Sequence, residues 1–145
     1  MSTRPVIVGI DGSDDSNAAL RWAAEFGQRY QAPVHAVLAW DIGPVYGVPT
    51  SYSQAEIDQM HDRATHALDT AVHDALGAEA EVITQVVRGY PASVLLEAAK
   101  SAQLLVVGSR GQSRVASMLA GSVSRECVNR ALCPVVVVPA ENTDV

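Results

Sequence analysis

Short runs of β-branched residues alternate along this chain with segments of helical periodicity, and no other sequence feature restricts the possible folds as strongly. Four runs, at residues 6–10, 34–38, 104–107 and 135–138, have the length and composition of buried strands. A fifth run, at residues 81–87, contains more polar positions and is typical of a strand with a less protected face or end. The chain is therefore predicted to contain five strands separated by helices.

The segments between these runs carry helix signals. Ser13 is the expected N-cap of the first helix. Ser53 and Glu56 form a capping box before the second and longest helix, and Gly77 marks its end. Helical patterns cover residues 15–30, a long apolar stripe at 57–75, residues 91–99 with proline in the first turn, and residues 122–132.

Strands that alternate with helices need crossover connections, which are right-handed and make the strands parallel. We therefore predict an α/β fold, a five-stranded open parallel sheet that is doubly wound, with helices on both faces. The order 3-2-1-4-5 follows if the first and fourth strands are neighbours, because residues suited to ligand binding cluster after these two. With 145 residues, of which 48% are apolar, the chain has room for a single domain over residues 1–145.

Composition excludes several classes of partner. Ten Lys and Arg residues against sixteen Asp and Glu residues give a net charge of −6, which argues against a broad face for nucleic acid or anionic membrane. No apolar run approaches ~20 residues and no basic stretch leads into a signal-type segment, so we expect a cytoplasmic protein. Cys127 and Cys133 are interpreted as reduced packing residues, because two cysteines make neither a disulfide scaffold nor a zinc site.

Candidate ligand-binding residues follow the first and fourth strands, whose carboxyl ends border the crevice of a doubly wound sheet. Gly108 and Gly111 lack Cβ atoms, so the turn there can expose backbone N–H groups to a phosphate. Gly121 leads into a helix start, which attracts anions through its free N–H groups and its dipole. Arg110 and Arg114 would add positive charge.

Asp11 suits a different task. A carboxylate at the end of the first strand can accept hydrogen bonds from ribose hydroxyls, as the acidic residue of dinucleotide-binding folds does. It can also serve as a turn residue before the first helix, and the two interpretations can coexist. For the glycines, the alternative is a tight strand exit and a helix entry without a ligand.

The spacing of the glycines resembles a known signature. Gly108-x2-Gly111-x9-Gly121-Ser122 is similar to the ATP-binding pattern of the universal stress protein family, and the order of elements is similar along nearly the whole chain. The resemblance implies that Asp11 meets the adenosine, that the backbone near Ala39 and Val107 flanks adenine, and that the glycine loop surrounds the phosphates. The nucleotide-binding residues expected are Gly9, Asp11, Ala39, Val107, Gly108, Arg110, Gly111, Gly121, Ser122, Val123 and Ser124.

The same resemblance implies a homodimer. In the order 3-2-1-4-5 the last strand is an edge, and an antiparallel pairing with its own copy would satisfy its outer N–H and C=O groups. Pro134 and Pro139 bracket the strand and limit the pairing to a short segment. The expected contact residues are Val135, Val136, Val137 and Val138.

These features favour an adenine-nucleotide-binding regulatory or stress-response module that holds ATP with Mg²⁺ and presents its state to a protein partner. The chain has neither a Gly-x4-Gly-Lys-[Ser/Thr] loop nor a Gly-x-Gly-x-x-Gly loop after the first strand. A slow ATPase or autophosphorylating enzyme is the rival, disfavoured because no Lys, His or carboxylate stands beside the phosphate loop to orient a water. A cAMP-binding protein and a nucleotide-free scaffold remain open.

Other residues are interpreted as structural. His61, His66 and His73 miss the apolar stripe of the long helix, so we expect a solvated face and no metal site. Trp22 falls on an apolar stripe and is expected in the core, whereas Trp40 either walls the base site or covers the end of the sheet. No catalytic residue is predicted.

Overall fold

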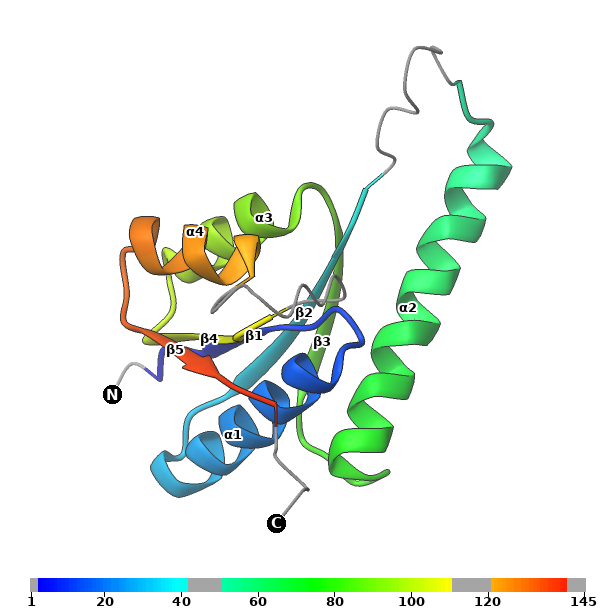
Figure 1. Cartoon of the computed structure of the whole chain (residues 1–145). Coiled ribbons are helices and arrows are strands. Elements are labelled where there is room, and N and C mark those ends of the chain that lie inside the picture. The colour runs from blue at the N-terminus through cyan, green and yellow to red at the C-terminus, as the bar shows by residue number, and fades with distance from the viewer. Residues whose placement is uncertain (1–2, 42–50, 111–120, 141–145) are drawn as a thin grey trace.

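Five parallel strands form one sheet in the computed structural model, which describes residues 3–41, 51–110 and 121–140 (Figure 1). Their spatial order is β3-β2-β1-β4-β5, and every neighbouring pair is parallel. The predicted fold class and strand order are confirmed. The strands are β1 (Val6–Gly9), β2 (Val34–Trp40), β3 (Ile83–Arg88), β4 (Leu104–Gly108) and β5 (Val135–Val138).

Helices cover both faces of the sheet. In the described part of the chain they are α1 (Asp14–Tyr30), α2 (Gln54–Leu76), α3 (Pro91–Ala99) and α4 (Ser122–Arg130). α1 and α2 pack on one face, and α3 and α4 on the other (Figure 1). Successive residues of β1 point to opposite faces of the sheet. Because helices cover both faces, both sets of residues are apolar. Val6 and Val8 belong to the core with Leu20 of α1. Ile7 belongs to the second core, with Leu95 of α3.

The helix ends have the capping groups that the sequence predicts. Ser13 accepts a hydrogen bond from the Ser16 backbone N–H at the start of α1. Ser53 and Glu56 form the reciprocal capping box at the start of α2. Gly77 ends α2 with a φ of 87°, a value that glycine adopts without steric cost.

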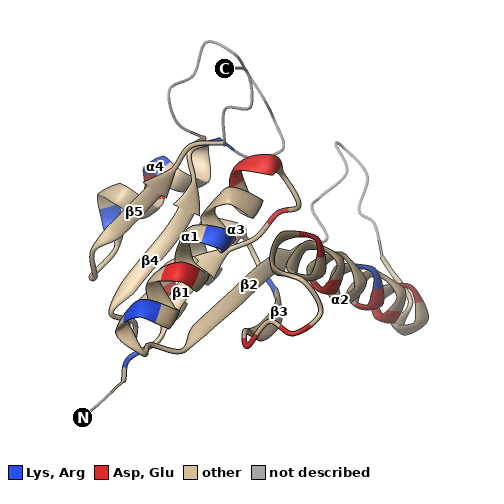
Figure 2. Ribbon diagram, turned by 90° about the horizontal axis from the view of Figure 1, so that it is seen from below, with Lys and Arg blue, Asp and Glu red and all other residues tan. Residues whose placement is uncertain are grey.

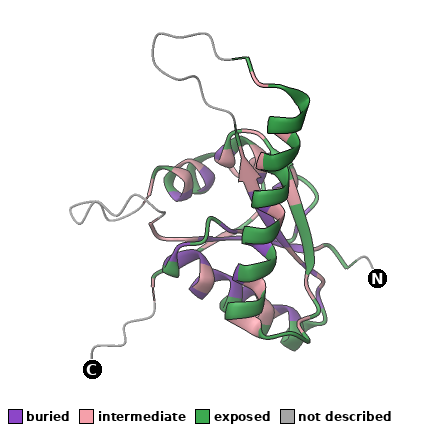
Figure 3. Cartoon of the chain, turned by 90° about the vertical axis from the view of Figure 1, so that its right-hand side faces the viewer, coloured by how far each residue is buried: buried purple, intermediate pink, exposed green. Residues whose placement is uncertain are grey.

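α2 presents mostly exposed residues to solvent (Figure 3). Its buried residues are the small or apolar Ala64, Leu68 and Ala71. The side chains of His61 and His73 are 53% and 68% exposed, so the predicted solvated face is confirmed. Across the described ranges, no three His, Cys, Asp or Glu side chains come together as a metal site.

Two expectations are wrong, one about the burial of Trp22 and one about the end of the fourth helix. Trp22 is 36% exposed rather than in the core, because its neighbours Leu20 and Ala23 are the residues of this turn that face the sheet. The Trp22 ring instead stacks on Phe26 along the flank of α1, with 5.4 Å between the ring centroids. The fourth helix ends at Arg130 rather than at residue 132, since Ala131 has extended backbone angles.

The limits of β5 are those predicted, the limits of the other strands differ by at most two residues, and β3 is the exposed edge strand that its polar positions indicate. Basic and acidic residues are interspersed along α1 and α2 (Figure 2). Both cysteines are free, as expected. Within the described residues no helix is long and apolar enough to cross a bilayer. The cytoplasmic location and the single-domain extent stay predictions.

Candidate functional site

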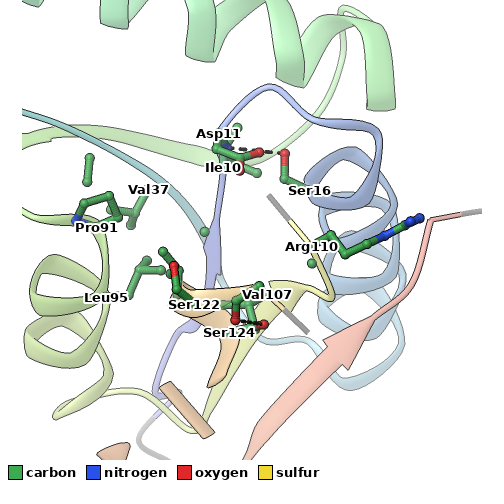
Figure 4. Close-up of a pocket in the computed structure, with 15 residues that line it drawn as sticks. Ile10, Asp11, Ser16, Val37, Pro91, Leu95, Val107, Arg110, Ser122 and Ser124 are labelled. Carbon is green, nitrogen blue, oxygen red and sulfur yellow. Dashed lines mark hydrogen bonds between the residues drawn. The ribbon is translucent and has the colours of Figure 1, made fainter. Parts of the chain in front are cut away.

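A cavity of about 330 Å³ opens at the carboxyl ends of β1, β2 and β4, where the strand order reverses. Parallel pairing brings these ends to one edge of the sheet, since Gly9 pairs with Val37 and Gly108 with Val138. Ligand sites of doubly wound sheets lie at this edge. The lining residues (Figure 4) are Gly9, Ile10, Asp11, Ser16, Val37, Ala39, Pro91, Leu95, Val107, Gly108, Arg110, Gly121, Ser122, Val123 and Ser124.

One end of the cavity is apolar. Val37, Leu95 and Val107 contribute to it from β2, α3 and β4, and each is at least 95% buried. Pro91 extends the same wall (Figure 4). A Cβ on Gly9 would lie 2.7 Å from a terminal methyl of Leu95, so glycine at this position lets α3 pack close to β1. This end can hold a flat, uncharged ring.

The other end is the start of α4. Gly121 is the N-cap residue of this helix, and among the described residues no side chain caps it. The backbone N–H groups of Ser122, Val123 and Ser124 have no carbonyl four residues earlier within the helix, and free N–H groups at a helix start favour an anion. The Ser124 hydroxyl donates to the carbonyls of Gly121 at 2.9 Å and Ser109 at 3.3 Å, so it connects the start of α4 to the residue that follows β4. The exposed Ser122 hydroxyl points into the cavity region (Figure 4).

Asp11 contributes to the cavity from the segment that follows β1. One oxygen of its carboxylate accepts a hydrogen bond from the Ser13 backbone N–H at 2.9 Å, and the Asp11 N–H donates to the Ser16 hydroxyl at 3.3 Å (Figure 4). The turn interpretation of Asp11 is thus present in the structure. The same residue is thus part of both the turn and the cavity lining.

Arg110 borders the cavity, yet its side chain extends away from the other lining residues (Figure 4). Its Nε atom lies 3.5 Å from the Oδ2 atom of Asp15, a carboxylate that is 2% exposed. The guanidinium charge is therefore paired with an acidic residue of α1 in this structure. Contact between this guanidinium and a bound phosphate would require a different rotamer.

Ten of the eleven predicted binding residues line this one cavity, and Gly111 lies outside the described residues, as does Arg114. Sequence reasoning did not select Ile10, Ser16, Val37 and Leu95. Their signal in the sequence is weak, because apolar residues of buried strands and helices look alike whether or not they face a cavity. Pro91 carries only the sequence signal of a proline in the first turn of a helix.

Trp40 covers the end of the sheet and does not wall this cavity. Its ring packs on the core beneath α2, 6.1 Å from the His61 ring in an edge-on arrangement. The Arg88 guanidinium lies 5.8 Å from the centroid of the Trp40 ring. Of the two interpretations of Trp40, the structural one is therefore correct.

A larger cavity of about 630 Å³ lies at the opposite edge of the sheet, between the C-terminal ends of α1 and α2. Glu25, Glu79 and Glu81 are among its lining residues, with Arg21 as the basic residue. It faces the amino ends of the strands and includes no helix N-terminus. The cavity beside α4 is the better site, because it joins an apolar wall to convergent N–H donors.

The chain is thus an α/β domain with a doubly wound parallel sheet and a cavity at the switch point, the place where folds of this class bind their ligands. The family model of the universal stress protein family matches residues 2–139. The chain therefore belongs to this family, and the resemblance seen in its glycine spacing is confirmed.

Relatives cover nearly the whole chain. The sequence is 34% identical to a universal stress protein of Mycolicibacterium smegmatis, over 94% of this chain and 48% of that protein. It is 30% identical to universal stress protein MJ0531 of Methanocaldococcus jannaschii, over 93% of this chain and 81% of that one. A universal stress protein crystallised in complex with cAMP is 29% identical, with a TM-score of 0.61, and the match covers 97% of this chain and 100% of that one. The chain thus spans about half the length of the M. smegmatis relative.

Proposed function

We propose that this protein binds an adenine nucleotide, ATP with Mg²⁺, in the cavity beside α4 and acts as a dimeric regulatory module. The observation that carries the proposal is the division of the cavity into a buried apolar wall and an uncapped helix start. A nucleotide has the same two ends, a flat base and a phosphate group. The relative crystallised with cAMP supports an adenine nucleotide.

In this proposal the base lies against Val37 and Leu95, and the small side chain of Ala39 leaves room for it. Asp11 accepts hydrogen bonds from the ribose hydroxyls. The phosphates meet the N–H groups at the start of α4, where the helix dipole favours negative charge. These assignments give each of the three parts of a nucleotide a chemically matched partner.

Mg²⁺ would arrive with the triphosphate. Over the described ranges no cluster of three acidic, His or Cys side chains forms a cage for an ion. Mg²⁺ is commonly bound through substrate phosphates and retained waters rather than by an all-protein site. The nucleotide's own oxygens would therefore be its main ligands.

A second candidate ligand is cAMP, which the complex of the 29% identical relative favours. The adenosine contacts would be the same. A single phosphate charge would suit an anion site made of neutral N–H donors, because the Arg110 guanidinium is paired with Asp15 in this structure.

Rapid ATP hydrolysis is not part of the proposal. Asp11 is the carboxylate of the described lining, and in this proposal it holds the ribose rather than the phosphate end, so it is poorly placed to orient an attacking water. Turnover should stay far below the ~1 s⁻¹ of a slow ordinary enzyme. Saturable phosphate release that is abolished by a cavity substitution would instead establish an ATPase.

The dimer is proposed to form through β5. This strand is the edge of the sheet next to β4, so one row of its backbone groups has no strand partner in the described sheet. Val137 on the strand is 37% exposed, and the nearby Leu132 and Val128 are 82% and 53% exposed. A second copy paired antiparallel along Val135–Val138 would cover this apolar edge.

Isothermal titration tests the ligand. Mg²⁺–ATP, AMP, cAMP and adenosine are titrated into protein that has been stripped of small molecules, and mass spectrometry identifies what co-purifies before stripping. We expect saturable binding of adenine nucleotides, and the order of affinities separates ATP from cAMP. Binding of none of the four would refute the proposal and favour a nucleotide-free scaffold.

A further inference from the structure

A buried carboxylate outside the cavity holds the turn that follows β4. Asp15, in the first turn of α1, is 1% exposed. Its Oδ2 atom accepts hydrogen bonds from the Ser109 hydroxyl at 2.7 Å and from the Arg110 backbone N–H at 3.0 Å. The Arg110 Nε atom is 3.5 Å away. A buried carboxylate is costly unless donors surround it, and here three donors from one turn do so.

Ser109 connects Asp15 to the start of α4, which is the candidate phosphate site. Its carbonyl accepts hydrogen bonds from the Gly121 N–H at 2.6 Å and from the Ser124 hydroxyl at 3.3 Å. Its own N–H donates to the Val138 carbonyl at 2.9 Å. One residue therefore connects α1, the end of β5 and the start of α4.

Asp15 contacts residues beside the cavity but is not one of the residues that line it. It does not border the cavity, yet the two segments that it connects, the Ser109–Arg110 turn and the α4 start, form the polar end. The same carboxylate keeps the Arg110 side chain against α1. Its influence on a ligand must therefore act through the position of these neighbours.

On the basis of the proposed nucleotide site, we propose that Asp15 is a positioning residue for the phosphate end of the ligand. It holds Ser109 so that the carbonyl of this residue fixes Gly121, and the following N–H groups of α4 then face the cavity. The side chains of the apolar end, which come from β2, α3 and Val107 of β4, make none of these hydrogen bonds. Loss of the carboxylate should weaken phosphate recognition and spare recognition of the nucleoside.

Asp15→Asn tests this, with Asp14→Asn as the matched control. Asp14 is the preceding residue and is exposed, so both changes remove one negative charge from the first turn of α1. Titrations with adenosine and with AMP are compared. We expect Asp15→Asn to weaken AMP about tenfold, because its neutral amide oxygen accepts the Ser109 and Arg110 hydrogen bonds more weakly than a carboxylate does, and to leave adenosine within about twofold. Asp14→Asn should change neither. Equal losses for both ligands, or no loss, would overturn the inference.

Amide hydrogen exchange provides a readout that needs no ligand. The Arg110 and Gly121 amides should exchange faster in Asp15→Asn than in the parent protein and in Asp14→Asn, and unchanged exchange would contradict the positioning role. Ser109→Ala, which removes the donor and keeps the charge, should have the same selective effect on AMP and is used if Asp15→Asn does not fold. If the parent protein binds neither adenosine nor AMP, the proposed function fails, and the exchange data still decide whether Asp15 anchors the loop.

Discussion

A Cβ atom on Gly108 would lie 2.8 Å from the Cβ of Asp15, closer than such atoms approach in proteins. The end of β4 and the first turn of α1 are therefore packed backbone against backbone. This approach is also what brings the Asp15 carboxylate to the Ser109 hydroxyl. Gly108 is therefore required for α1 to pack against β4, whether or not a ligand is bound.

Gly108→Ala should consequently destabilise the protein. The added methyl group has to displace Asp15, and overpacking of this kind costs typically ~1–3 kcal/mol in the free energy of unfolding. Urea denaturation measures the change. Gly77→Ala is the comparison, because a Cβ there meets nothing within 4 Å and its cost is confined to the φ of 87°. A midpoint for Gly108→Ala equal to that of the parent would show that the two segments are not in close contact.

Asp11→Ala should weaken ATP and AMP alike. A lost hydrogen bond between a carboxylate and a hydroxyl at a partly buried site costs ~1.5–3 kcal/mol, or about tenfold to a hundredfold in affinity. Because Asp11 also accepts from the Ser13 N–H, Asp11→Asn is the informative partner, since its amide oxygen can preserve the turn. Titration calorimetry checks both variants. If neither affinity changes, Asp11 serves the turn alone.

Gly121→Val should reduce the affinity for ATP by crowding the phosphate end. Gly121 has φ −68° and ψ 161°, an extended conformation that valine adopts without strain, so the fold should be retained. We expect AMP to weaken with ATP and adenosine to be affected least. The measurement is titration of the well-folded variant, and unchanged ATP affinity would remove the proposed site.

Val137→Lys should dissociate the proposed dimer, because Val137 is the exposed residue of β5, whereas Val136 packs against the core of its own chain. A lysine on the edge strand places charge in the apolar contact and is a recognised way of blocking edge pairing. Light scattering at micromolar concentration should report about twice the 15.3 kDa chain mass for the parent and a value approaching one chain for the variant. Val87→Lys on β3, the opposite edge, should leave the mass unchanged. A monomeric parent protein, with or without nucleotide, would end the dimer proposal.

Burial raises the pKa of the Cys127 thiol to about 11, with Glu126 and Cys133 adding smaller effects. The folded state therefore holds this proton more tightly than the unfolded chain, in which the thiol ionises near pH 9. The resulting stability is present below pH 9 and is lost as the pH rises to about 11, on the order of 2 kcal/mol. Urea unfolding at pH 8 and pH 10.5 should show a smaller pH-dependent loss for Cys127→Ala than for the parent. Equal losses would contradict the shift.

Several features could be predicted from the sequence because their causes are local. The capping box of Ser53 and Glu56 involves residues three apart, and the β-branched runs report buried strands directly. The strand order followed from the rule that ligand-type residues gather at the switch point, applied to the segments after β1 and β4. The glycine spacing similarly led to the family, and of its glycines Gly108 ends β4 and Gly121 precedes the first turn of α4.

The sequence by itself thus determined the α/β class, the helix caps and the segments that approach the cavity. Only the tertiary structure decided which side chains of those segments line the cavity or hold the residues that line it. Asp15 reads in sequence as an ordinary acidic residue of a first helical turn, and its contact with Ser109 spans 94 positions. Trp22 lies on an apolar stripe yet sits at the flank of α1. Periodicity defines the faces of an element, whereas the packing of neighbouring elements determines which face is covered and which carboxylate meets a distant donor.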